Sequence, residues 1–306
     1  MSGLNVSLAY FLTVVAFGAA FRVIRRKCPC LSFAAEFSAS FVLVACWLEV
    51  QTIMEVGEWA GGLGTEVTLV LLFLVLLTHG VICDGATGNP SLTLMNVLLL
   101  EATTLHVLCY AMLDLAAQFL GAHVSMLVAG YYWALELNDM HMIKNLMSGE
   151  CSTTLRSSLT QGIFTEFFCS IFFGLIYLRL RRHPAIIRVP LVAAVLTFFS
   201  YSAKGFTSAF LNPSLAYGLT FYCPGFSVME YAMVYWLAPV IGMMLAVRLY
   251  MGHIPKIFAK NLLFSQKTRF RVPKGEGKKN KLFAGLLVHH LLKRLPSDMT
   301  AMQHLV

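Results

Sequence analysis

The sequence predicts an all-α polytopic membrane protein that is built as an inverted repeat. Composition is the first observation: 58% of the 306 residues are hydrophobic and 12% are charged, whereas ordinary soluble domains have roughly 25% charged residues. Apolar runs are the second, since a hydrocarbon core about 30 Å thick needs roughly 20 residues of helix. The third is one short motif used twice, Asn89-Pro90-Ser91 and Asn212-Pro213-Ser214.

Seven apolar runs are candidates for membrane spans. They cover residues 4–21, 33–54, 67–82, 105–133, 163–180, 186–202 and 228–250. Each Asn-Pro-Ser motif follows a long run and is followed by a shorter apolar segment. The pattern therefore predicts seven spans and two half-length helices.

Lys and Arg are concentrated on alternate connectors, which sets the orientation. The segment 248–281 holds ten Lys and Arg residues against a single Glu, whereas the connectors 55–66 and 135–158 hold only Lys144 and Arg156. These two connectors are therefore predicted on the non-cytoplasmic side, and the last six spans form a core with both ends in the cytoplasm. The first run is then an extra N-terminal apolar helix, with an interfacial or cleaved segment as the alternative.

The chain divides into five predicted segments. They are the extra apolar helix with its basic stop at 1–27, a first repeat at 28–134, a non-cytoplasmic connecting loop at 135–158, a second repeat at 159–250 and a basic cytoplasmic tail at 251–306, in which 281–295 has the spacing of an amphipathic helix. A basic tail beside a membrane attracts anionic lipid. Because the positive charge follows membrane topology, no nucleic-acid partner is expected.

Each Asn-Pro pair predicts the start of a short helix. Asn caps the free amides of a first turn, and Pro fits there because its missing N–H is not needed. Each repeat has three spans, an odd number, so the second copy is inverted relative to the first. The two half-helices therefore enter from opposite faces and meet near the middle of the membrane.

A carboxyl near the start of each repeat belongs to the same pattern. Glu36 precedes Asn89 by 53 residues, and Glu166 precedes Asn212 by 46. Because an unpaired carboxyl inside a membrane is costly, we expect both to be structural residues that accept N–H bonds from the re-entrant loops. Proton relay is the alternative.

Together these features resemble the aquaporins, or major intrinsic proteins, over about residues 33–250. Residues 118–122 (Gln-Phe-Leu-Gly-Ala) and 235–242 (Tyr-Trp-Leu-Ala-Pro-Val-Ile-Gly) carry further parts of the likeness. The resemblance implies the aquaporin fold, with three spans and one re-entrant half-helix in each repeat. It also implies a homotetrameric passive channel for water, with no enzymatic activity, cofactor or metal; glycerol and hydrogen peroxide are further candidate solutes.

Departures from the usual family pattern resemble its divergent superaquaporin branch. Both motifs end in Ser where Ala is usual, Leu215 stands where the constriction Arg is usual, and Cys223 lies nine residues beyond Ser214. Segments 3–8, 206–213 and 266–273 resemble one subgroup of that branch. The branch implies an intracellular membrane such as the endoplasmic reticulum, with the plasma membrane as the alternative.

The resemblance also implies that the two motifs, Asn89-Pro90-Ser91 and Asn212-Pro213-Ser214, line the pore. Asn89 and Asn212 are expected to donate hydrogen bonds to one passing water; as the alternative, both are only helix caps. By offset from the motifs, the constriction is expected at four residues: Leu69, Ser200, Ala209 and Leu215. Without an Arg this ring of residues is apolar. Two alternatives therefore stay open: a wider selectivity filter, or an apolar gate that closes the pore by dewetting. Lys204 is expected at the membrane interface, with a positive charge in the pore as its alternative.

The cysteines do not indicate a metal site, because their spacing is not that of a metal-ligating pair and no matching His cluster accompanies them. Cys151 and Cys223 are predicted on the non-cytoplasmic side, where they can be oxidised. The resemblance to this branch implies that Cys223 is a structural residue that supports packing or the oligomer. The alternative is a thiol without a structural role. The alternative function for the whole chain is a non-conducting or gated structural membrane protein of organelles with the same fold.

Overall fold

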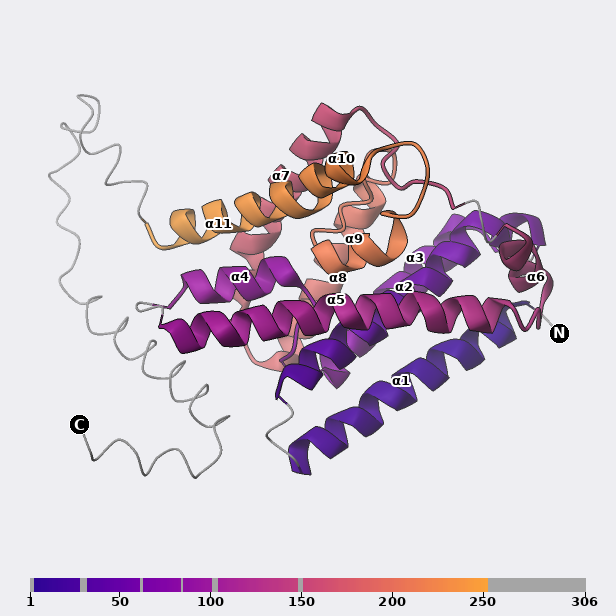
Figure 1. Ribbon diagram of the computed structural model, residues 1–306, viewed down its shortest axis with the longest axis horizontal. Coiled ribbons are helices and arrows are strands. Elements are labelled where there is room, and N and C mark those ends of the chain that lie inside the picture. The colour runs from indigo at the N-terminus through magenta and orange to yellow at the C-terminus, as the bar shows by residue number, and fades with distance from the viewer. Residues whose placement is uncertain are drawn as a thin grey trace, which may run out of the picture.

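The computed structural model describes residues 3–27, 32–60, 63–83, 85–100, 104–147 and 151–252. Every regular element within these ranges is helical, and Figure 1 shows long helices packed side by side with shorter ones between them. The elements are α1 (Gly3–Lys27), α2 (Ser32–Ala60), α3 (Thr65–Ile82), α4 (Pro90–Leu98), α5 (Leu105–Trp133), α6 (Asp139–Leu146), α7 (Leu159–Leu180), α8 (Ala185–Ser202), α9 (Pro213–Leu219), α10 (Val228–Ala232) and α11 (Ala238–Tyr250), with a π-helical segment at Met233–Leu237. The predicted tail helix at 281–295 lies outside the described residues.

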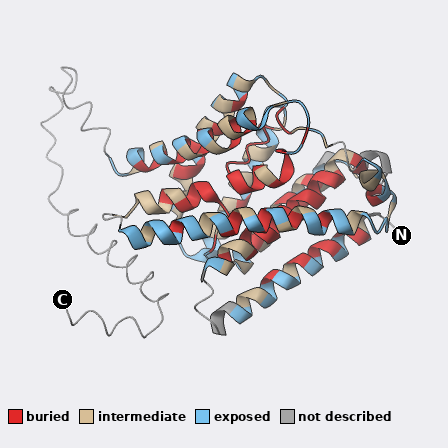
Figure 2. Ribbon diagram, viewed as in Figure 1, coloured by how far each residue is buried: buried red, intermediate tan, exposed pale blue. Residues whose placement is uncertain are grey.

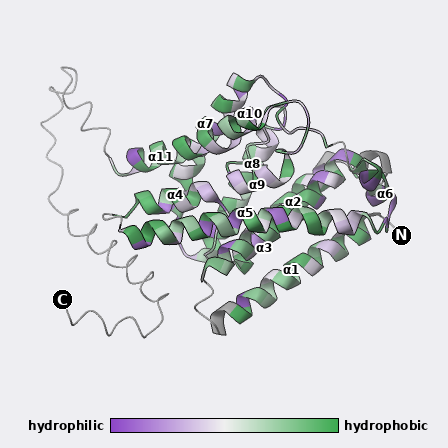
Figure 3. Cartoon of the chain, viewed as in Figure 1, coloured by the Kyte–Doolittle hydropathy of each residue, from purple (hydrophilic) through white to green (hydrophobic). Residues whose placement is uncertain are grey.

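Length and apolar character separate the spanning helices from the rest. In the described part of the chain six helices are long and apolar enough to cross a bilayer: Leu4–Ile24, Phe33–Gly57, Leu105–Trp133, Leu159–Leu180, Ala185–Ser202 and Val228–Tyr250. A shorter apolar helix, Glu66–Ile82, matches the remaining predicted run. Figure 3 shows hydrophobic residues along these helices and hydrophilic ones on the connecting helix α6. The prediction of an all-α polytopic membrane protein is confirmed.

The extra N-terminal helix α1 runs along α2 through the depth of the bundle. Near its start the Ser7 hydroxyl donates to Glu49 of α2, which is fully buried and also accepts from His141 Nε2 of α6 at 2.8 Å. Near its end Arg22 Nη1 donates to the Val81 carbonyl of α3 at 3.1 Å. The two ends of α1 therefore contact opposite ends of the bundle, and that the helix is an extra membrane span stays a prediction.

One glycine contact is repeated in both halves of the fold. Helix α5 packs closely on α2, and α11 packs in the same way on α7. A Cβ at Gly121 of α5 would lie 2.4 Å from the carbonyl oxygen of Phe37, and one at Gly242 of α11 would lie 2.5 Å from that of Phe167. Both Phe residues directly follow the paired Glu residues of the repeats. The inverted repeat is therefore visible in the packing as well as in the sequence.

Burial is very unequal among the spans. In α2, 78% of the apolar window is buried inside the protein, against 6% in α8. Figure 2 shows the same contrast between the buried interior and the exposed outer faces. Helix α2 is therefore the central helix of the bundle, packed on several sides by the others.

Candidate functional site

Both Asn-Pro-Ser motifs begin a half-helix as the sequence predicts. Asn89 caps α4, its Oδ1 accepting from the Ser91 N–H at 2.9 Å. Asn212 caps α9, its Oδ1 accepting from the N–H groups of Ser214 at 3.1 Å and Leu215 at 3.4 Å. In each case Pro occupies the first turn, where its lack of an N–H leaves no donor unsatisfied. Both half-helices therefore start inside the protein with their positive ends facing inward.

The two motifs hold each other through reciprocal hydrogen bonds. Asn89 Nδ2 donates to the Leu211 carbonyl at 3.1 Å, and Asn212 Nδ2 donates to the Gly88 carbonyl at 3.0 Å. The Ser214 hydroxyl donates to the same Gly88 carbonyl at 2.9 Å. A side-chain amide carries two N–H donors, so each Asn that gives one hydrogen to the opposite loop keeps a second.

Each repeat clamps its re-entrant loop with the paired Glu. Glu36 accepts from the N–H groups of Thr87 and Gly88, at 3.1 and 2.9 Å, and from a Gln118 side-chain N–H at 2.8 Å. Glu166 is fully buried and accepts from the N–H groups of Phe210 and Leu211, at 3.0 and 2.9 Å. Both carboxylates thus make the contacts that the acceptor interpretation requires.

The loops carry unusual backbone angles just before the asparagines. Gly88 has φ +58°, and Leu211, at the equivalent place in the second repeat, has φ +53°. A Cβ at Gly88 would lie 2.7 Å from the Ser40 nitrogen, so only glycine fits there. Ser208 and Ala209 also have positive φ, which costs on the order of 1–3 kcal/mol per non-glycine residue. The second loop is therefore strained and depends on its clamp.

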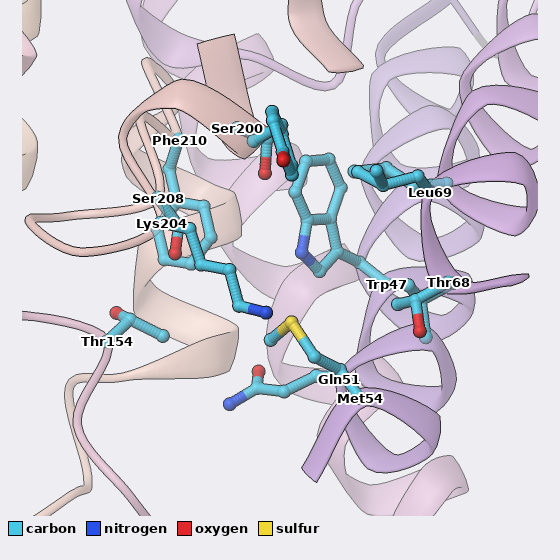
Figure 4. Close-up of a pocket in the computed structure, with 13 residues that line it drawn as sticks. Trp47, Gln51, Met54, Thr68, Leu69, Thr154, Ser200, Lys204, Ser208 and Phe210 are labelled. Atoms are coloured by element: carbon cyan, nitrogen blue, oxygen red, sulfur yellow. The ribbon is translucent and has the colours of Figure 1, made fainter. Parts of the chain in front are cut away.

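A cavity lies beside the second motif, between α2, α3, α8 and the re-entrant loop (Figure 4). It holds about 40 Å³. One water needs roughly 10–15 Å³, so the cavity has room for about three. The lining residues are Trp47, Val50, Gln51, Met54, Thr68, Leu69, Leu72, Thr154, Ser200, Tyr201, Lys204, Ser208 and Phe210.

The cavity brings together two of the four predicted constriction residues. Leu69 and Ser200 line it, but Ala209 and Leu215 do not. Ala209 is turned by its positive φ into a core cluster with Leu211, and Leu215 is buried in the main core. The loop residues on either side of Ala209, Ser208 and Phe210, line the cavity, and the constriction of four residues stays a prediction.

Comparison of the sequence with known protein families identifies the family of this chain. A family model described as major intrinsic protein matches residues 25–250. The chain belongs to the major intrinsic protein family. Members of this family are channels and not enzymes, so the chain is a multi-pass membrane protein of a channel family with the aquaporin fold.

Individual relatives place this major intrinsic protein within the family. It is 42% identical to aquaporin-12 of Mus musculus over 283 residues, 90% of this chain and 95% of that protein. It is 29% identical to aquaporin-11 of Rattus norvegicus over 254 residues, and 29% identical to aquaporin-11 of Homo sapiens over 259; these matches cover 82% and 81% of this chain and 90% of each relative. The predicted superaquaporin branch and its aquaporin-12-like subgroup are therefore confirmed.

An aromatic pair that the sequence analysis missed lies between the cavity and the motifs. Trp47 of α2 and Phe210 of the loop meet edge to face, with ring centroids 5.8 Å apart. Lower on α2, the Ser40 hydroxyl donates to that of Ser214 at 3.3 Å. At 1.5 Å per helical residue, Trp47 lies about 10 Å above Ser40, and Met54 about 20 Å above it. The spacing of Trp47, Gln51 and Met54 on one helix face is the signal that could have identified this wall.

A second, larger space opens toward the predicted non-cytoplasmic side. It holds about 650 Å³ and is lined by Met54, Glu55, Val56, Ile143, Met147, Ser152, Arg156 and Lys204. Lys204 lines both spaces. From just beyond the end of α8 its side chain extends toward Met54 (Figure 4), and it lies beside the larger space on the predicted non-cytoplasmic side.

A disulfide ties the connecting loop to the second half-helix. Cys151 bonds to Cys223, with their Cα atoms 5.0 Å apart. The loop that follows Cys151 carries Thr154, which lines the cavity, and Arg156, which lines the larger space. The bond therefore anchors part of the wall of both spaces near the end of α9.

Proposed function

We propose that the protein is a passive channel for water, and for small neutral solutes such as glycerol or hydrogen peroxide. The observation that carries this proposal is the reciprocal hydrogen bonding of the two capped half-helices, which leaves one spare N–H on Asn89 and one on Asn212. Two donors at the junction of two helix N-termini are suited to a neutral molecule that has a free acceptor.

The same arrangement accounts for exclusion of protons and cations. A water that accepts from both asparagines has its own hydrogens directed outward, which interrupts a chain of hydrogen-bonded waters. Each helix N-terminus carries the equivalent of roughly half a positive charge. A cation at the junction would meet both of them in a site that excludes most bulk water.

The proposed path runs along α2. It enters through the 650 Å³ space, passes Met54 and Lys204 into the 40 Å³ cavity, and passes Trp47 and Phe210 to reach the asparagines. The smaller cavity takes about three waters. Glycerol has six heavy atoms, so its passage requires side chains to move, and we expect water to pass faster.

Osmotic shrinkage of proteoliposomes tests the proposal. The double variant Asn89→Asp with Asn212→Asp places two carboxylates against the loop carbonyls and removes both spare donors. Asn96→Asp is the matched control on α4, because Asn96 accepts from Arg181 at 3.1 Å and an aspartate there gains an ion pair. We expect flow above empty liposomes in the wild type and the control, and flow near the lipid background in the double variant.

No flow above background from folded wild-type protein would refute the channel and support a non-conducting or gated structural protein instead. A homotetramer and an intracellular membrane, both implied by the family resemblance, complete the proposal. Chemical crosslinking in native membranes and fractionation of organelles test these two points.

A further inference from the structure

Met54 and Lys204 lie at the boundary between the two spaces of the proposed path, and this pair is called the neck below. These are the only residues that line both spaces among those the structure describes. Met54 belongs to α2, and Lys204 lies just beyond the end of α8 on the opposite wall. In Figure 4 the Lys204 side chain extends across the opening toward Met54 and Gln51. On the proposed path, a solute that moves between the two spaces passes the Lys204 ammonium.

The charge of this ammonium is not neutralised by a neighbouring carboxylate in the described part of the chain. The acidic residue that lines the larger space there, Glu55, is engaged elsewhere: it accepts from Lys144 Nζ at 2.7 Å, from the Ser152 hydroxyl at 2.8 Å and from the Gln51 amide at 2.7 Å. Arg156 adds a second cation to the same wall. The neck is therefore electropositive.

We propose that Lys204 is a further cation-excluding residue of this channel, which a cation meets on the proposed path before it reaches the two helix N-termini. The inference rests on the proposed function and names the residue that sets its charge selectivity on the non-cytoplasmic side. Leu215, at the position of the family's constriction Arg, is buried in the core and carries no charge. Lys204 supplies a positive charge from a different wall, and its three N–H donors let water pass while a cation is repelled.

A purely structural role for Lys204 is disfavoured by its contacts. In the described chain its hydrogen bonds involve only the backbone: the Lys204 N–H donates to the Tyr201 carbonyl at 3.2 Å, and the Lys204 carbonyl accepts from Arg156 Nη1 at 3.5 Å. Replacing the side chain leaves that carbonyl in place and strands no buried polar partner. Substitutions that change the charge are therefore expected to fold.

A charge series at position 204 in proteoliposomes tests the inference. Wild type, Lys204→Arg, Lys204→Met and Lys204→Glu are compared for osmotic water flow, for potassium leak under a diffusion potential and for proton leak with an entrapped dye. We expect cation leak to rise about tenfold from wild type to Lys204→Glu, with Lys204→Met between them and Lys204→Arg like wild type. Water flow should change by less than about threefold, because the neck remains open.

Arg179→Met is the matched control, since Arg179 is exposed at the predicted cytoplasmic end of α7. It removes one positive charge far from the neck, and its leak should equal that of wild type. Equal cation leak in all four forms at position 204, with water flow retained, overturns the role of Lys204 and leaves the channel intact. A wild type without water flow overturns both the channel and this inference.

Discussion

The Glu166 clamp offers the sharpest test of how the second half-helix is held in place. In Glu166→Gln the amide keeps one oxygen that can accept, but its NH2 group faces a loop N–H that needs an acceptor. One of the two N–H groups, of Phe210 or Leu211, therefore loses its partner in a fully buried place. Leaving a buried donor unsatisfied costs about 1–3 kcal/mol, and slightly more when the lost acceptor was ionised.

That cost is large beside the strain that the loop already carries. Ser208, Ala209 and Leu211 all have positive φ, and each costs on the order of 1–3 kcal/mol unless the surroundings hold it. With one clamp bond gone the loop can relax toward ordinary angles, which would move the Leu211 carbonyl away from Asn89 Nδ2. We therefore expect Glu166→Gln to reduce water flow as well as stability.

The matched control is Glu230→Gln, because Glu230 also accepts a backbone N–H, from Ser227 at 2.7 Å, but in an exposed helix cap. The assay combines thermal unfolding in mild detergent with stopped-flow shrinkage of proteoliposomes. Glu166→Gln should unfold several degrees below wild type and lose most of its water flow, whereas Glu230→Gln stays close to wild type. Equal behaviour of the two variants would show that the buried clamp does not hold the loop.

Two further predictions concern the packing and the connecting loop. Gly121→Ala and Gly242→Ala each place a Cβ within 2.6 Å of a backbone carbonyl oxygen and should lower the free energy of unfolding by about 1–3 kcal/mol. The control is Gly130→Ala, whose Cβ would meet nothing within 4 Å, so it should leave stability unchanged or raise it. A different ranking of the three variants in thermal unfolding contradicts the close helix contact. Cys151→Ser opens a loop that the disulfide closes across 72 residues, so it should lower the free energy of unfolding by about 2–4 kcal/mol in non-reducing detergent. An unchanged unfolding temperature would show that the disulfide does not form, and so would alkylation of the Cys223 thiol in the native wild type.

The parts of this protein that sequence reasoning predicted are those whose signals are local. An apolar run of the length of a bilayer indicates a span without reference to any partner, and all seven runs correspond to helices. An Asn-Pro pair caps a helix through contacts one to three residues away, so the starts at Pro90 and Pro213 follow from the motifs alone. The paired Glu residues were recognisable because the repeat presents them twice.

The parts that were missed depend on contacts between distant segments. Whether Ala209 or its neighbours face the cavity is decided by positive φ values in the loop, and these are held by Glu166, more than 40 residues earlier. Glu49 gives no local signal beyond one carboxyl in an apolar run. Its partners come from α1, α5 and α6, namely Ser7, Trp133 Nε1 at 2.9 Å and His141.

The two halves of the repeat share a plan but not the same chemistry, and this difference bears on the selectivity of the proposed path. The first loop presses Gly88 against the backbone of α2 so closely that no side chain fits there, and the Gly88 carbonyl already accepts from Asn212 Nδ2 and the Ser214 hydroxyl. The second loop carries side chains at the equivalent places, and Ser208 and Phe210 line the cavity. Its motif serine, Ser214, bonds to the opposite loop, whereas the Ser91 hydroxyl is buried without a recorded partner among the described residues. On the proposed path the Gly88 loop is therefore a fixed support, and the groups that line the cavity come from the second loop, from α8 and from the faces of α2 and α3.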